Sequence, residues 1–130
     1  MILADSNILI DYYRDRTSKL AKKIDSMPLA ICGIIKAEIL HGAKNSEEIN
    51  NLLASFSTFD LLHIDEYDYE GAGFILQTLR ENGLSVPFTD VMIAFCAMKY
   101  DAQLWTNDGH FRLIQGLYPE LSFYHPDIDD

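Results

Sequence analysis

The chain has 130 residues, of which 48% are apolar, and its 20 acidic and 10 basic side chains give a formal net charge of −10. This length and composition are typical of a single domain over residues 1–130 with one core. The apolar start is too short for a signal peptide, and no apolar run approaches the roughly 20 residues that span a bilayer, so we expect a soluble cytoplasmic protein with no membrane partner.

Short apolar runs alternate with segments of helical periodicity along the chain. The expected strands, in order, are 2–4, 29–32, 59–64, 103–106 and 121–124. The expected helices, in order, are 8–23, 34–43, 45–56, 68–82, 90–100 and 108–114. This alternation predicts a three-layer α/β/α domain with a mainly parallel central sheet of about five strands.

Four carboxylates stand at one end of this predicted sheet. Asp5 follows the first strand, Glu38 lies one turn into the helix after the second, Asp90 opens the helix that leads to the fourth strand, and Asp108 follows that strand. Parallel sheets bind ligands outside the carboxyl ends of their strands. Singly, the aspartates could be helix caps and Glu38 an exposed helix position. The convergence of all four favours a site.

Such a cluster needs protons or cations, because two like charges about 4 Å apart repel by roughly 4 kcal/mol at an effective dielectric constant near 20. A site made of carboxylate oxygen suits Mg²⁺ or Mn²⁺ better than Zn²⁺. An ion held in this way activates water and stabilises charge on phosphodiester oxygens. The acids therefore indicate metal-assisted phosphate chemistry.

Other reactive side chains have simpler interpretations. His110, two residues after Asp108, could support the site, and His41, one turn after Glu38, could approach it, but packed or surface positions explain both histidines. The cysteines, Cys32 and Cys96, stand in apolar segments and are predicted to be buried thiols. The chain has no glycine-rich phosphate loop and no zinc-ligand spacing.

Four segments of the chain resemble the motifs of PIN-domain ribonucleases, and more narrowly of the VapC-type toxins of prokaryotic toxin–antitoxin systems: ADSNILID, KAEILHG, FTDVMIAFCA and LWTNDGHF. Their order and spacing match the family over nearly the whole chain. The residues that the resemblance assigns to the site are Asp5, Glu38, Asp90 and Asp108, supported by Asn7 and Thr106. One departure is His110, where some relatives carry a further acid.

The resemblance implies an endoribonuclease toxin that uses Mg²⁺ or Mn²⁺ to hydrolyse RNA phosphodiester bonds with a metal-activated water. Asp5, Asp90 and Asp108 would bind the ion, while Glu38 would bind a second ion or position the water. The resemblance also implies inhibition by a cognate VapB-like antitoxin and assembly as a homodimer or larger oligomer. An acidic toxin suits a positively charged antitoxin segment.

The net charge alone argues against nucleic acid as a partner, since phosphate binding usually requires a basic surface. However, half of the basic residues lie between positions 14 and 23. Arg14, Arg16 and Lys19 from this stretch are candidate contacts to the RNA backbone, although a solvated helix face explains them equally well.

Three alternatives differ from this interpretation. A haloacid-dehalogenase-like phosphatase needs a second acid two residues after the first, where this chain has Asn7. A phosphoacceptor receiver module needs adjacent acids after the first strand and a late lysine, but Asp5 is single and no lysine follows Lys99. A catalytically inactive PIN-like module that binds RNA or protein stays open, although four intact acids argue against it.

Overall fold

The computed structural model of the protein describes residues 1–126. The last four residues of the single domain expected over 1–130 lie outside the described residues. Among the helices of the described part, none is long and apolar enough to cross a membrane.

Four short parallel strands form the central sheet in the order β3-β2-β1-β4. Their bounds are Ile2–Ala4 for β1, Ala30–Cys32 for β2, Asp60–Leu62 for β3 and Gln103–Trp105 for β4. In the register, Leu3 of β1 lies opposite Ala30 on one side and Leu104 on the other. Because this central strand is apolar and covered on both faces, it fixes the middle of the core.

The expected fifth strand at 121–124 is wrong, since this segment forms only one bridge, between Leu104 and Phe123. Two backbone hydrogen bonds hold it beside β4, from the Leu104 N–H to the Ser122 carbonyl and from the Tyr124 N–H to the Leu104 carbonyl. A proline stands nearby on each side, at positions 119 and 126. Since proline cannot donate to a ladder, pairing cannot extend through either position.

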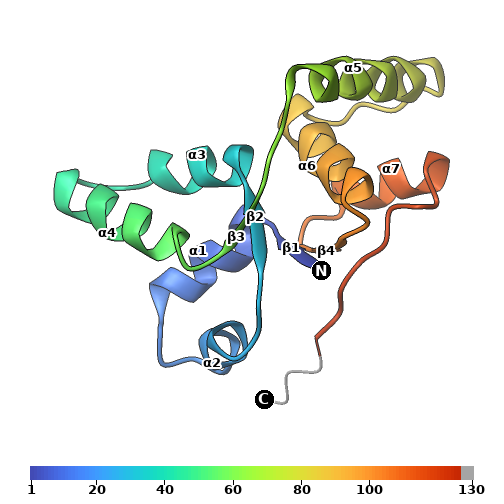
Figure 1. The fold of residues 1–130 in the computed structure, drawn as a ribbon. Coiled ribbons are helices and arrows are strands. Elements are labelled where there is room, and N and C mark those ends of the chain that lie inside the picture. Colours follow the sequence, from blue (N-terminus) through green and yellow to red (C-terminus); the bar gives the residue numbers. More distant parts are fainter. Residues whose placement is uncertain (127–130) are drawn as a thin grey trace.

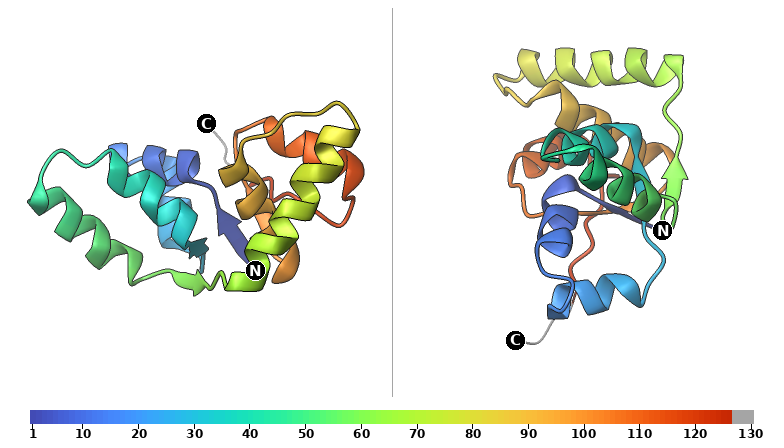
Figure 2. Two further views of the ribbon diagram at one scale, coloured as in Figure 1. Left: turned by 90° about the horizontal axis from the view of Figure 1, so that it is seen from above. Right: turned by 90° about the vertical axis from the view of Figure 1, so that its left-hand side faces the viewer.

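Seven helices in the described part flank the sheet. Their bounds are Ser6–Arg14 for α1, Lys19–Asp25 for α2, Gly33–His41 for α3, Ser46–Phe56 for α4, Glu66–Glu81 for α5, Phe88–Lys99 for α6 and His110–Leu117 for α7. Figures 1 and 2 show α1, α3 and α4 on one side of the sheet and α5, α6 and α7 on the other. The predicted three-layer α/β/α architecture is thereby confirmed.

The single helix expected over 8–23 is instead two helices, α1 and α2, separated by a turn. The Asp15 carboxylate accepts hydrogen bonds from the Thr17 hydroxyl at 2.6 Å and the Thr17 N–H at 3.0 Å. The Ser18 hydroxyl then accepts from the Ala21 N–H at 3.0 Å and caps α2. Asp and Ser side chains offer the backbone this alternative to helical bonds, so the chain turns within the polar stretch 14–19.

Four helix starts differ from the expected positions by two residues. Helices α1 and α6 begin earlier than expected, at Ser6 and Phe88. Helix α5 begins at Glu66, before the expected residue 68, because Asp65 and Asp68 form a reciprocal capping box. Helix α7 begins at His110, which leaves Asp108 in the loop after β4. Asp108 therefore lies in the short loop between the end of β4 and the start of α7.

Helix α6 is the most deeply buried of the helices that pack around the sheet. Val91, Met92, Ile93, Ala94 and Ala97 have no exposed surface. The two small alanines let the helix approach its neighbours closely. Because Asp90 stands in the first turn of this helix, the packing of α6 also fixes the position of a site residue. The predicted burial of Cys32 and Cys96 as free thiols is confirmed.

The connections between strands define where a ligand can bind. From β1 through β2 to β3 the chain uses helices on one side of the sheet, and then α5 and α6 carry it back across the other side to β4 (Figure 1). The adjacent strands β1 and β4 therefore send their following helices to opposite faces. Open parallel sheets bind ligands in the crevice at such a point.

The burial of α6 leads to a first prediction. Ala94→Leu inserts three carbons into a fully buried position and should lower the free energy of unfolding by about 1–3 kcal/mol, measured by urea denaturation. Ala54→Leu is the matched control on the exposed side of α4, and it should change stability by less than about 0.5 kcal/mol. Equal effects of the two substitutions would contradict the close packing of α6.

Candidate active site

Asp5 is the central acid of the site and is only 4% exposed. Its N–H donates to the carbonyl of Trp105 at 2.9 Å, which ties the end of β1 to the end of β4. One carboxylate oxygen, Oδ1, accepts from the Ser6 N–H at 2.8 Å, so Asp5 does cap α1. The other oxygen, Oδ2, accepts from the Thr106 hydroxyl at 2.6 Å. The residue is thus both a cap and a site-facing acid.

Asn7 and Thr106, predicted as supporting residues, join a polar network around Asp5. The Asn7 amide nitrogen donates to Asp5 Oδ2 at 3.3 Å and to Thr106 Oγ1 at 3.4 Å. Asn7 Oδ1 accepts from the Asn107 N–H at 3.3 Å, and Thr106 Oγ1 accepts from the Asp108 N–H at 3.0 Å. This network holds the segment after β4 against the start of α1, and it orients two of the four acids.

Asp90 and Asp108 come together with His110. One ligand atom from each of these three residues lies within 4.8 Å of the others. His110 Nδ1 is 3.4 Å from Asp90 Oδ2 and 3.3 Å from Asp108 Oδ1, and the His110 N–H donates to Asp108 Oδ1 at 2.9 Å. His110 therefore belongs beside the acids. Its spacing from Asp108 was the sequence signal. The position of His110 at the start of α7 places its ring beside both aspartates.

Glu38 approaches the same acids from α3 on the other side of the sheet. Burial raises the pKa of the Glu38 carboxyl, and the negative charges of Asp5 and Asp90 raise it further. Within residues 1–126, its buried oxygen Oε1 has no hydrogen-bond partner. A buried polar atom without a partner costs about 1–3 kcal/mol, so this oxygen has an unfilled capacity for a proton or a cation.

The two buried aspartates of the site, Asp5 and Asp90, are also biased toward the neutral form. The pKa of Asp5 is raised, chiefly by burial and also by the charge of Asp108, although the hydrogen bonds from Thr106 and Ser6 lower it in part. The pKa of Asp90 is raised by burial and by the charges of Asp108 and Asp5, against the opposing effect of His110. Since the pKa values of Asp5, Glu38 and Asp90 are all raised, the residues fit a bound cation.

The donor set decides which ion these residues fit. Several carboxylate oxygens with one imidazole nitrogen are compatible with Mg²⁺ or Mn²⁺, and the group lacks the thiolates that structural zinc sites favour. Such a group could hold an ion and align a water and a phosphodiester beside it.

The basic residues singled out in the sequence do not form one surface. Arg14 pairs with Asp11 at 3.2 Å, and Arg16 pairs with Asp25 at 3.7 Å while its guanidinium carbon lies 4.2 Å from the centre of the Tyr12 ring. Lys19, in contrast, makes no ion pair within residues 1–126. The turn between α1 and α2 separates it from the two arginines. His41 is exposed at the end of α3, and the group of acids does not include it.

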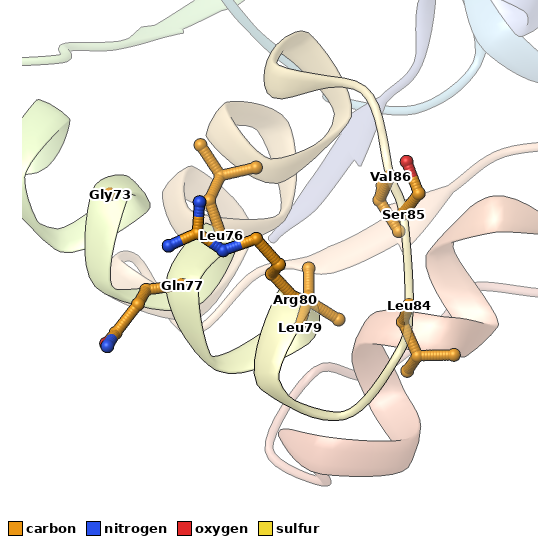
Figure 3. Close-up of a pocket in the computed structure, with 8 residues that line it drawn as sticks. All are labelled: Gly73, Leu76, Gln77, Leu79, Arg80, Leu84, Ser85 and Val86. Atoms are coloured by element: carbon orange, nitrogen blue, oxygen red, sulfur yellow. The ribbon is translucent and has the colours of Figure 1, made fainter.

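Two hollows that the sequence did not reveal flank the acids. A groove of about 600 Å³ between α1, α3 and α4 has Glu38 in its wall. A cavity of about 910 Å³ beside the end of β4 has Thr106 in its wall. Figure 3 shows a third cavity, of about 400 Å³, between α5 and the loop before α6. None of the site acids lines this third cavity, so it plays no part in the site.

Known proteins similar to this chain share its fold. Ribonuclease VapC1 of Methanocaldococcus jannaschii is 27% identical over 116 residues, which cover 88% of this chain and 81% of that protein. The crystal structure of VapBC2 from Rickettsia felis, bound to a promoter DNA fragment, superposes with a TM-score of 0.79 at 23% identity, covering 98% of this chain and 100% of that one.

A second solved structure is VapBC-1 from nontypeable Haemophilus influenzae, with a TM-score of 0.77, 24% identity and coverage of 95% of this chain and 97% of that one. The sequence profile described as "PIN domain" matches residues 2–117. This match spans all four strands and all seven helices described above, and the chain therefore belongs to the PIN-domain family.

Proposed function

We propose that this protein is a divalent-metal-dependent endoribonuclease toxin of the VapC type. The observation that carries the proposal is the unpartnered buried oxygen of Glu38 beside acids whose pKa values are raised. A PIN fold supports a nuclease, and the similarity to a VapC ribonuclease supports RNA as the substrate.

In the proposed mechanism, Asp5, Asp90 and Asp108 would hold the ion, with the imidazole nitrogen of His110 beside them. The ion would supply positive charge that favours ionisation of the attacking water and stabilises the phosphodiester oxygens. Glu38 takes the proton from the attacking water, because a carboxylate with a raised pKa is a stronger base than an ordinary one. As the water oxygen bonds to phosphorus, a P–O ester bond breaks and the leaving oxygen takes a proton from solvent. Thr106 and Asn7 keep Asp5 oriented while this transfer takes place.

The choice of ion follows from the same residues. Carboxylate oxygens accept both Mg²⁺ and Mn²⁺. The nitrogen of His110, 3.3–3.4 Å from the carboxylate oxygens of Asp108 and Asp90, adds a ligand type that Mn²⁺ tolerates more readily than Mg²⁺. We therefore propose that either ion supports cleavage.

The groove between α1, α3 and α4 is the proposed binding site of an antitoxin. Its wall combines apolar residues such as Ile39 and Leu52 with two carboxylates, Glu38 and Glu48, and two cations, Arg14 and Lys44. An amphipathic segment that brings one basic side chain to Glu38 complements this combination. Since Glu38 belongs to both the groove and the site, a basic side chain bound there would neutralise the acids and exclude the ion. Several structural neighbours are themselves VapBC complexes.

The catalytic proposal predicts that the protein cleaves single-stranded RNA with Mg²⁺ or Mn²⁺ and loses this activity in a chelator. Glu38→Gln should slow cleavage by about 10²–10⁴-fold, because the amide cannot accept the proton. Asp60→Asn, at an exposed position of β3, is the matched control and should cleave at the unchanged rate. Cleavage that survives the chelator would contradict the proposal, and binding of RNA without cleavage would favour the inactive PIN-like module.

The raised pKa values of Asp5, Glu38 and Asp90 predict a pH dependence of stability. Without metal, the folded state binds more protons than the unfolded state, so the free energy of unfolding falls as pH rises above the ordinary values of 3.8 and 4.5. Asp5→Asn removes one of these groups, so its stability relative to the wild type should increase with pH in urea denaturation. A difference that does not vary with pH would contradict this explanation.

Divalent ions should restore part of the free energy of unfolding that the protein loses as pH rises. At neutral pH, Mg²⁺ should stabilise the wild type by about 2.7 kcal/mol at an ion concentration 100 times the dissociation constant. The Asp5→Asn variant should gain less at the same concentration.

The groove proposal predicts that Leu52→Glu weakens binding of the cognate antitoxin by at least about tenfold. The substitution replaces a half-buried apolar side chain of the groove by a carboxylate. This carboxylate must lose its hydration when the partner binds. Calorimetry of the purified pair measures the effect. Ala54→Glu on the same helix lies outside the groove lining and should bind normally. Equal affinity of the two variants would place the antitoxin elsewhere.

A further inference from the structure

A cavity of about 910 Å³ lies beside the acids, on the opposite side from the groove. It is open to solvent, and it is bordered by α1, the start of α2, the loop after β4 and the final described segment. The lining residues used below are Lys19, Trp105, Thr106, Asn107 and Tyr124. We call it the Lys19–Tyr124 cavity. Its volume falls within the range of about 300–1,000 Å³ that is usual for small-molecule sites.

The Lys19–Tyr124 cavity adjoins the proposed active site through two residues of its wall. Thr106 donates its hydroxyl proton to Asp5 Oδ2 at 2.6 Å. Asn107 donates its N–H to Asn7 Oδ1 at 3.3 Å. A nucleic acid strand with one phosphate at the acids would therefore pass beside this cavity.

The charge in the Lys19–Tyr124 cavity suits a phosphate. Lys19 forms no ion pair among the described residues, and no carboxylate within residues 1–126 lines the cavity. On a chain with a net charge of −10, such a lining is a favourable place for a phosphate, because the nearest groups act on it most strongly.

The wall also contains an aromatic pair. The rings of Trp105 and Tyr124 meet edge to face, with centroids 5.1 Å apart and an interplanar angle of 65°. Trp105 is only 3% exposed, and its ring packs against the half-buried ring of Tyr124. The hydrogen bond from the Tyr124 N–H to the Leu104 carbonyl, at 2.9 Å, fixes the backbone of this segment against β4. A supported aromatic ring of this kind is a platform on which an unpaired base can stack.

We propose that the Lys19–Tyr124 cavity holds the unpaired nucleotide next to the scissile phosphate of a single-stranded RNA. Tyr124 stacks on the base, and Lys19 contacts the phosphate. The inference rests on the proposed ribonuclease function and adds to it a subsite for one nucleotide. Stacking requires a base whose face is exposed, so the subsite selects unpaired over paired RNA. It does not select the identity of the base, because every base can stack.

The test measures binding of fluorescein-labelled hexauridylate to the full chain in EDTA, so that no cleavage occurs. Tyr124→Leu should weaken binding by about tenfold, since stacking on one aromatic side chain contributes about 1–3 kcal/mol. Tyr124→Phe keeps the ring and should restore the affinity. A loss that Tyr124→Phe does not restore would contradict stacking.

Lys19 is tested by salt dependence. Each phosphate contact contributes about 0.7 to the slope of log affinity against log salt for a single strand. Lys19→Ala should lower this slope by about that amount, while Tyr124→Leu should not. Lys22→Ala, at an exposed position one turn further along α2 and outside the cavity, is the matched control and should keep the wild-type slope. An unchanged slope for Lys19→Ala would contradict the phosphate contact even if Tyr124→Leu were too unstable to measure.

Trp105 provides an independent signal because it is the only tryptophan of the chain. Hexauridylate should change its fluorescence, and a blunt RNA duplex should not. If the wild type cleaves RNA while Lys19→Ala and Tyr124→Leu bind hexauridylate normally, the cavity proposal is overturned and the ribonuclease proposal stands. If hexauridylate binds with the expected losses but no RNA is cleaved in Mg²⁺ or Mn²⁺, the ribonuclease proposal fails and the subsite stands.

Discussion

The mutual repulsion of carboxylates at the end of the sheet is the constraint on which the rest of the structure depends. Asp5 and Asp90 are buried there, and Glu38 keeps an oxygen without a partner. The fold tolerates them because rigid apolar elements carry each acid, and because the hydroxyl of Thr106 and the amide of Asn7 hold Asp5 in place. The packing of the core therefore offsets the repulsion among the acids when no cation is bound. Functional sites often lower the stability of a fold in this way.

The architecture was predictable because its strands are short, apolar and separated by helical periodicity. In a parallel sheet, residues that follow strands share one edge, so Asp5 and Asp108 could be placed together from sequence alone. The expected helix over 8–23 failed because two apolar groups, 8–13 and 20–24, were joined across six polar residues. The hydrogen bonds of Asp15 and Ser18 form the turn in this polar stretch, and an Asp-x-x-Ser sequence was the available signal.

The least predictable parts of the site depend on distances between elements. The sequence placed His110 near Asp108, but only packing of α7 against α6 brings its ring to Asp90 as well. The same holds for Arg16 in the basic stretch, which pairs with Asp25 of the next helix. The pair between Arg14 and Asp11, in contrast, has the i,i+3 spacing of a helix and was visible in the sequence. The hollows on either side of the acids are likewise a product of helix arrangement.

An acidic protein that binds RNA needs an explanation, and the two hollows supply one. At physiological ionic strength, charges further apart than about 8 Å are largely screened, so a phosphate responds to the groups lining its own site more than to the net charge of −10. Lys19 lies where no carboxylate of the described residues lines the wall. With so few cations, affinity for RNA must come mainly from stacking and from the ion. The proposed substrate is therefore held where an unpaired base can stack on Tyr124, while the separate groove that contains Glu38 stays available to the proposed antitoxin.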